Sequence, residues 1–312
     1  MARLGIFPKA PVHPTGNALL YRKKVHELGR TYCRTGQKGK QMKEIFRYDD
    51  HTRLQFIELP NQDGLKMRGL LHIPEAASET NRVPAALVLH GFMGHRIGTA
   101  FSNAHLSKAI ADAGIANLRL DFIGSGESDG NYEDMSILTE LDEAKLQLDY
   151  LKSLPFVDPD RIAVFGHSQG GLVAGLLGGE RPDEIRCIAL SSPGFDIGED
   201  WKKGILNGLD PEKLKRDGWI DIKGYKVGYR YYKDALDTPT YEIASRYHGP
   251  VQIVHGTADK IVPIEYGRRL KEVYGEKCTM IEVEGADHDY SSVAFADARI
   301  RHTVDFLKEH LF

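Results

Sequence analysis

The chain of 312 residues is long enough for one large domain or two small ones. Its formal net charge of −3 excludes the broadly basic surface with which proteins bind nucleic acid. Three cysteines, none in a CxxC pair, argue against a disulfide framework or a zinc cluster. Without a membrane-length apolar run or a secretory signal, we expect a soluble cytoplasmic protein that binds neither nucleic acid nor membrane.

Residues 1–43 differ in composition from the rest of the chain. They are rich in lysine and arginine and show little apolar periodicity, which predicts a flexible basic extension. Met42 is an alternative start of translation. We therefore expect the folded domain to occupy residues 44–312.

From residue 52 onward the pattern is that of a layered α/β domain. Two apolar runs flank the turn sequence "NQDG", which predicts an antiparallel hairpin. Short apolar runs such as "PAALVLHG", "RIAVFGHS" and "VQIVHGTAD" then alternate with helical segments such as "ILTELDEAKLQLDYLKSL". Strands that are apolar throughout and separated by helices indicate a mostly parallel, doubly wound sheet. The fold class is therefore α/β.

The interval 194–246 breaks this alternation. It holds both tryptophans, Trp201 and Trp219, and the aromatic cluster "GYKVGYRYY". It is too long for a simple crossover between strands and too aromatic for a linker. We interpret it as an inserted cap subdomain over the carboxyl ends of the strands, where open α/β sheets bind ligands.

A G-x-S-x-G motif spans residues 166–170 between a predicted strand and a predicted helix. In that context the motif forms a sharp turn that exposes the serine, here Ser168, and the glycines make the turn sterically possible. A serine hydroxyl becomes an effective nucleophile only beside an oriented general base. The sequence therefore has to supply a base and an acid on later strands.

Two loops after later strands supply these groups in the required order. Asp259 follows "VQIVHG" and His288 follows "TMIEVEGAD", which matches the order serine, acid, histidine of this fold. His288 would accept the Ser168 proton, and Asp259 would fix the imidazole tautomer. Asp121 is the rival acid, but it precedes the serine, and the order rule favours Asp259.

Other polar residues near these loops are assigned structural roles. His90 and His167 are expected to support local structure, and Asp287 and Asp289 are expected to point away from the serine. Acyl transfer also needs two donors for the oxyanion, and we expect the backbone N–H groups of Phe92 and Gln169 to supply them.

The region from about residue 54 onward resembles the α/β-hydrolase superfamily, and more narrowly the bacterial cinnamoyl (feruloyl) esterases. The segments that carry the resemblance are "LHGFMGHR", "RLDFIGSGESDG", "VFGHSQGGLVAG", "IVHGTADKIVP" and "EGADHDYS". The resemblance implies an α/β-hydrolase fold with a small cap over a pocket for a phenolic ring. It further implies that Asp200, Tyr229 and Tyr231 meet the substrate. The basic extension has no counterpart in the family pattern.

The leading hypothesis is a serine carboxylesterase that cleaves hydroxycinnamate esters through an acyl-enzyme, with a small-molecule substrate and no metal or cofactor. A lipase or monoacylglycerol hydrolase, another short-chain carboxylesterase, a thioesterase, an acyltransferase and a serine peptidase are the enzymatic alternatives. From a different class, a ligand-binding receptor could keep the fold without catalysis. A homodimer is left open.

Overall fold

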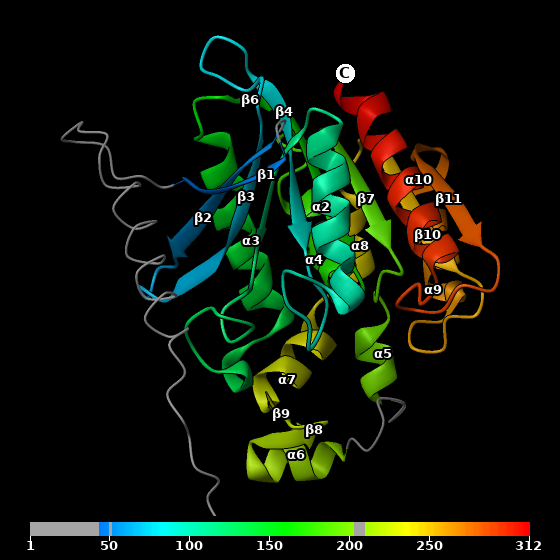
Figure 1. Ribbon diagram of the computed structural model, residues 1–312. Helices are drawn as coiled ribbons and strands as arrows, with labels where there is room; N and C mark the ends of the chain where they lie inside the picture. The colour runs from blue at the N-terminus through cyan, green and yellow to red at the C-terminus, as the bar shows by residue number, and fades with distance from the viewer. Residues whose placement is uncertain (1–43, 50–51, 203–209) are drawn as a thin grey trace, which may run out of the picture. The chain divides into compact units, whose positions relative to one another are not determined.

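The computed structural model describes residues 44–49, 52–202 and 210–312, which belong to one compact unit spanning Lys43–Phe312 (Figure 1). The expected basic extension over residues 1–43, with Met42 and Cys33, lies outside the described residues. The side chains of the first strand are likewise outside the description.

The strands of the main sheet are β1 (Glu44–Asp49), β2 (Thr52–Pro60), β3 (Lys66–Pro74), β4 (Val83–Leu89), β5 (Ala116–Leu120), β6 (Val157–His167), β7 (Cys187–Ser191), β10 (Val251–Gly256) and β11 (Cys278–Val283). A separate two-stranded sheet consists of β8 (Trp219–Ile222) and β9 (Tyr225–Gly228). The α-helices are α2 (Ser102–Asp112), α3 (Ile137–Lys152), α4 (Gln169–Glu180), α5 (Ile197–Lys202), α6 (Pro211–Asp217), α7 (Tyr229–Asp237), α8 (Thr240–Ser245), α9 (Ile264–Tyr274) and α10 (Val293–Leu311). The short 3₁₀ helices are η1 (Thr99–Phe101), η2 (Tyr132–Asp134) and η3 (Gly275–Lys277).

Within the described part of the chain, the main sheet has nine strands in the order β1-β2-β3-β5-β4-β6-β7-β10-β11. The six neighbouring strands β5, β4, β6, β7, β10 and β11 run parallel to one another. The antiparallel pairs are β1 with β2, β2 with β3 and β3 with β5. In the β2–β3 hairpin, Gly64 adopts a φ of 80° in the predicted "NQDG" turn. The predicted doubly wound sheet with an antiparallel start is confirmed.

Helices cover both faces of this sheet, which explains why its central strands are apolar throughout. On β6, Val164 belongs to the cluster formed with α3, α4, α8 and α9. Its neighbours Ala163 and Phe165 belong to the cluster formed with α2 and α10 on the opposite face. Successive strand residues point to opposite faces, so each run of apolar residues fills two cores at once.

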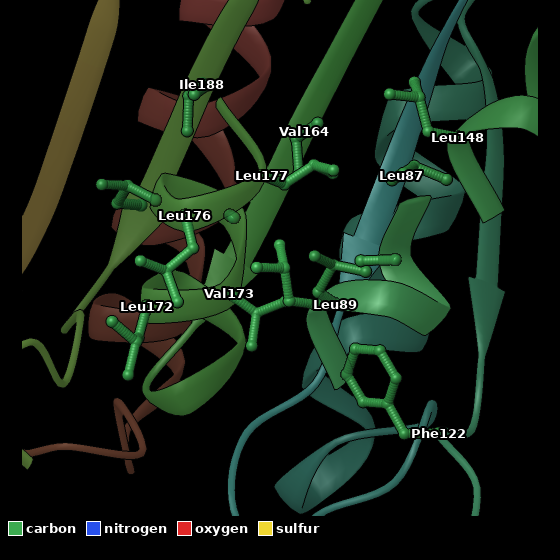
Figure 2. Packing of buried hydrophobic residues seen from close by; sticks show 14 of the residues in the cluster. Leu87, Leu89, Phe122, Leu148, Val164, Leu172, Val173, Leu176, Leu177 and Ile188 are labelled. Atoms are coloured by element: carbon green, nitrogen blue, oxygen red, sulfur yellow. The ribbon is translucent and has the colours of Figure 1, made fainter. Parts of the chain in front are cut away.

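Helix α4 packs against the centre of the sheet directly behind the G-x-S-x-G turn. Figure 2 shows Leu172, Val173, Leu176 and Leu177 of this helix facing strand residues that include Leu87, Leu89 and Val164. All of these side chains are almost fully buried. This packing fixes the start of α4, and with it the turn that precedes the helix.

The predicted insertion is bounded by β7 and β10. Between these two strands the structure describes helices α5 to α8 and the small β8–β9 hairpin, apart from residues 203–209. Tyr231 and Trp201, 0% exposed, form the buried centre of this segment, with ring centroids 5.7 Å apart. Among the described residues, no helix combines the length and the apolar character needed to cross a membrane.

The close approach of α4 to β4 gives a first prediction. A Cβ atom on Gly170 would lie 2.4 Å from the carbonyl oxygen of Leu89 and 2.5 Å from that of His90. Backbone atoms cannot yield as side chains do, so Gly170→Ala should lower the free energy of unfolding by about 3 kcal/mol or more. Urea denaturation measures this loss. Gly194→Ala is the control, because its nearest neighbour would lie at 3.8 Å; equal stability of the two variants would contradict the account.

Candidate active site

Ser168 lies between β6 and α4 in a backbone conformation that residues other than glycine rarely adopt. Its φ is 57° and its ψ is −122°. A Cβ atom on Gly166 would lie 2.0 Å from the carbonyl oxygen of Gly170, so only glycine fits there. The Ser168 N–H donates to the carbonyl of Ser191 at 2.9 Å, and the Ser168 carbonyl accepts from Gly194 at 3.1 Å. The surrounding strands therefore hold the strained serine in place.

A hydrogen-bonded chain joins Ser168 to the two residues expected to activate it. The Oγ of Ser168 lies 3.0 Å from Nε2 of His288, and Nδ1 of His288 lies 2.8 Å from Oδ2 of Asp259. An ionised carboxylate can only accept, so this contact assigns the imidazole proton to Nδ1 and leaves Nε2 to accept from the serine hydroxyl. The three predicted residues thus come together from loops after β6, β10 and β11.

Several donors converge on the Asp259 carboxylate. Its Oδ1 accepts from the backbone N–H groups of Ile261 and Val262, each at 2.9 Å, and its Oδ2 also lies 3.4 Å from Nε2 of His255. Burial alone would raise the pKa of Asp259, but the hydrogen bonds from His255, His288 and Val262 outweigh it and hold this pKa well below its usual 3.8. Asp259 is therefore an ionised, immobile partner for the imidazole.

Asp121, the rival acid, has a different set of partners. Its Oδ1 accepts the Arg96 N–H at 2.6 Å, its Oδ2 accepts the Glu127 N–H at 3.1 Å, and Arg96 also forms an ion pair with it through its guanidinium. The side chain is fully buried. Asp121 therefore anchors the loop after β4, which carries Phe92, and makes no contact with His288.

Burial lowers the pKa of two other histidines near the serine, so both are neutral. His90 accepts the N–H of Phe122 through Nε2 at 3.0 Å. His167 has Nδ1 3.2 Å from the carbonyl oxygen of Ser191, and its ring centroid lies 4.9 Å from that of His288.

The loop after β4 approaches the nucleophile closely. A Cβ atom on Gly91 would lie 3.0 Å from that of Ser168. Among the described residues, neither the N–H of Phe92 nor that of Gln169 has a hydrogen-bond acceptor. Two unpaired backbone donors beside a serine hydroxyl are the arrangement that stabilises an oxyanion.

A buried network ties both of these residues together. The Gln169 side chain donates to Oε2 of Glu140 on α3 at 2.7 Å and accepts from the Tyr231 hydroxyl on α7. The Tyr231 ring stacks on Phe92, with centroids 4.9 Å apart and planes 22° from parallel. Burial raises the pKa of Glu140 to about 8, so the carboxyl is protonated at neutral pH.

A cavity of about 580 Å³ surrounds Ser168 and His288. Asp200 and Tyr231 line it, although the Asp200 carboxylate accepts from the Tyr266 hydroxyl and the Tyr231 hydroxyl is bonded to Gln169. Tyr229 is not among the lining residues, contrary to what the resemblance implied. Its ring centroid lies 5.9 Å from that of Tyr232, and the half-buried side chain packs against the edge of the main apolar cluster.

The structure also corrects the interpretation of the residues around His288. Asp287 accepts from the N–H of Ser291 at 2.8 Å and so belongs to its own loop. Asp289, which we expected to point away, lines the cavity. Arg299 of α10 lines it as well and was not predicted. One signal was available, because Arg299 falls on the buried stripe of α10 with Thr303 and Phe306.

Comparisons with known proteins define the class. The profile of the prolyl oligopeptidase family matches residues 100–312. Est1E from Butyrivibrio proteoclasticus, solved with ferulic acid bound, is 30% identical, with a TM-score of 0.74 over 81% of this chain and 98% of that one. A monoacylglycerol lipase from Paleococcus ferrophilus shares 24% identity, with a TM-score of 0.57 over 74% of this chain and 97% of that one, and supports the fold alone. An uncharacterised Mycobacterium tuberculosis protein is 26% identical over 75% of this chain and 72% of its own length.

The fold and these comparisons define an esterase-like α/β-hydrolase, as the sequence predicted. Within that class, the chain belongs to the prolyl oligopeptidase family of serine hydrolases.

The two acids give opposite expectations when substituted. Asp259→Asn should reduce kcat/KM for an activated ester by roughly 10³- to 10⁴-fold, because the wrong imidazole tautomer is favoured. Asp121→Asn should instead lower the free energy of unfolding by about 3 kcal/mol, because Arg96 loses its buried partner. Ester kinetics and urea denaturation of both variants check this. A larger kinetic loss in folded Asp121→Asn than in Asp259→Asn would reverse the assignment.

The raised pKa of Glu140 predicts that the free energy of unfolding depends on pH. The pKa of this carboxyl is about 8 in the folded protein and near 4.5 in the unfolded chain, so folding takes up a proton between these values. Stability should therefore fall as the pH rises through this window, by at most about 1.4 kcal/mol per pH unit from this group. Glu140→Gln keeps an acceptor for Gln169 and should flatten the slope.

Urea denaturation at several pH values measures that slope. The exposed Glu309→Gln is the matched control and should leave it unchanged. Identical slopes for the wild type and Glu140→Gln would show that the buried carboxyl ionises at an ordinary pH.

Proposed function

We propose that this protein is a serine carboxylesterase that hydrolyses hydroxycinnamate esters, such as feruloyl esters, through an acyl-enzyme. The observation that carries the proposal is the hydrogen-bonded chain from Ser168 through His288 to Asp259 at the wall of the cavity. The similarity to Est1E, which binds ferulic acid, supports the acyl group. The cavity is lined in part by apolar and aromatic side chains, among them Ile197, Ile222 and Tyr231 of the cap, with Leu172 of α4 and Tyr266 of α9. Such a slot suits a flat aromatic ring.

The proposed reaction follows from the hydrogen-bond directions. His288 takes the proton of Ser168 Oγ as that oxygen attacks the ester carbonyl. The negative charge on the carbonyl oxygen is stabilised by the N–H groups of Phe92 and Gln169. His288, now an imidazolium beside ionised Asp259, returns the proton to the leaving alcohol. Water then cleaves the acyl-enzyme by the same route in reverse.

We propose residues 44–312 as the catalytic domain and residues 194–246 as its cap. The cap contributes Tyr231, which contacts both proposed oxyanion donors: its ring stacks on Phe92, and its hydroxyl bonds the side chain of Gln169. An aromatic ring of the substrate that binds against Tyr231 would therefore lie next to the residues proposed to stabilise the oxyanion. Asp200, on α5, offers a carboxylate for a phenolic hydroxyl.

We further propose a cytoplasmic location and a small-molecule ester as the partner, with a homodimer as an open assembly state. The location rests on the low cysteine count.

A peptidase is the second candidate, because the matching family is that of prolyl oligopeptidase. Cleavage of a proline-containing peptide anilide by the purified protein, at a kcat/KM above that for methyl ferulate, would favour it.

Ser168→Ala tests the proposal. This substitution should reduce kcat/KM for methyl ferulate by roughly 10⁴-fold or more, because the nucleophile is removed. The exposed Ser153→Ala is the matched control and should retain wild-type kinetics. The wild type should also prefer methyl ferulate to a medium-chain monoacylglycerol. Wild-type hydrolysis by Ser168→Ala would overturn the mechanism, and a reversed preference would overturn the acyl group.

A further inference from the structure

Part of the cavity around Ser168 is lined by polar residues from outside the cap. They are Ser102 and Asn103 of α2, His167 at the end of β6, Asp289 of the loop after β11 and Arg299 of α10. We call these five residues the polar side of the cavity. Its chemistry differs from that of the apolar residues of the cavity, and the proposed reaction uses none of its side chains.

Arg299 is the charged centre of the polar side. The residue is only 1% exposed, and its guanidinium carbon lies 5.1 Å from the centroid of the Tyr290 ring. Its Nε and Nη2 atoms are buried without a hydrogen-bond partner among the described residues. Nε and Nη2 form one edge of the guanidinium, the pair of donors that a carboxylate accepts side by side. A buried charge without such partners is costly, so the site favours an anionic ligand.

Asn103 is a second buried group without a partner on this side. It comes from α2, which packs against α10, and it is 3% exposed. Its Oδ1 atom is buried and has no hydrogen-bond partner among the described residues. A side-chain amide can offer either an acceptor or two donors. Two helices therefore present unsatisfied polar groups to the same side of the cavity.

The position of His288 indicates which part of a bound ester, the acyl part or the alcohol part, would lie near the polar side of the cavity. The imidazole returns its proton to the leaving oxygen, so the alcohol part must lie beside Nε2. His167, on the polar side, has its ring centroid 4.9 Å from that of His288. The His167 ring in turn lies 6.4 Å from that of Tyr290, which the Arg299 guanidinium contacts. An alcohol part beside Nε2 of His288 would therefore extend toward Arg299, and the acyl part would be left with the apolar residues of the cavity.

We propose that Arg299 forms a subsite for a carboxylate carried on the alcohol part of the substrate. The proposal rests on the esterase function above and specifies its leaving group: esters of a hydroxy acid. Asp289 is the one carboxylate on the polar side. It is not within ion-pair distance of Arg299 in the described part of the chain, although its charge acts to raise the pKa of the guanidinium against the lowering by burial. The negative charge of Asp289 repels an anionic ligand, so binding of the substrate carboxylate would depend more strongly on Arg299.

Matched pairs of feruloyl esters test the subsite. Each pair joins ferulate to an ω-hydroxy acid or to the corresponding neutral carboxamide, over a short series of chain lengths. For at least one length the wild type should prefer the carboxylate by about 10- to 100-fold in kcat/KM, the range expected for a charged hydrogen bond. Arg299→Gln should bring the ratio close to one, Arg299→Lys should keep part of it, and Asp289→Asn should raise it.

A structural role for Arg299, through its contact with Tyr290, would lower both members of a pair equally and leave the ratio unchanged. That result overturns the proposal, as does a wild-type ratio of one or less at every length. The wild-type ratio is informative even if the Arg299 variants fail to fold.

Calorimetry separates the subsite from the catalytic proposal. Ser168→Ala should bind the carboxylate ester more tightly than the carboxamide, and the double variant with Arg299→Gln should bind them equally. If the wild type cleaves no ester but this preference persists, the esterase function fails and the subsite stands. If methyl ferulate is cleaved and no preference appears, the subsite fails alone.

Discussion

The strained backbone of Ser168 is the constraint on which the rest of the site depends. A residue with φ of 57° at the junction of a strand and a helix is stable only when both elements are fixed independently. Strand β6 is fixed by its pairing with β4 and β7, and α4 is fixed by the apolar residues seen in Figure 2. The turn exposes Oγ and frees the next N–H from helical bonding. Nucleophile and oxyanion donor are thus proposed to arise from one backbone geometry.

The second layer of the site is electrostatic. Asp259 is ionised because four donors surround it, whereas Glu140, with a single side-chain donor, stays protonated at neutral pH. The two carboxyl groups are both buried, and their hydrogen bonds and neighbouring charges distinguish them: His288 lowers the pKa of Asp259, whereas Glu143 raises that of Glu140. One can hold a positive imidazolium. The other can hold a neutral amide in place beside the oxyanion donors.

Much of the fold followed from periodicity alone. Strands buried on both faces must be apolar throughout, so runs such as "PAALVLHG" and "VQIVHG" predicted parallel strands, and their order brought Ser168, Asp259 and His288 to one edge of the sheet. The direction of individual side chains was not accessible in the same way. Tyr229 and Tyr231 are two residues apart on α7, and only the rotation of that helix decides which of them lines the cavity. Arg299 lies on the buried face of its helix, where most sequences carry an apolar residue.

The most direct test of the central claim is covalent labelling of the native protein with a fluorophosphonate, followed by peptide mapping. We expect one modified residue, Ser168, and labelling that slows when His288 is replaced by alanine. Ester hydrolysis by a preparation whose label lies on another residue, or that takes up no label, would contradict this claim.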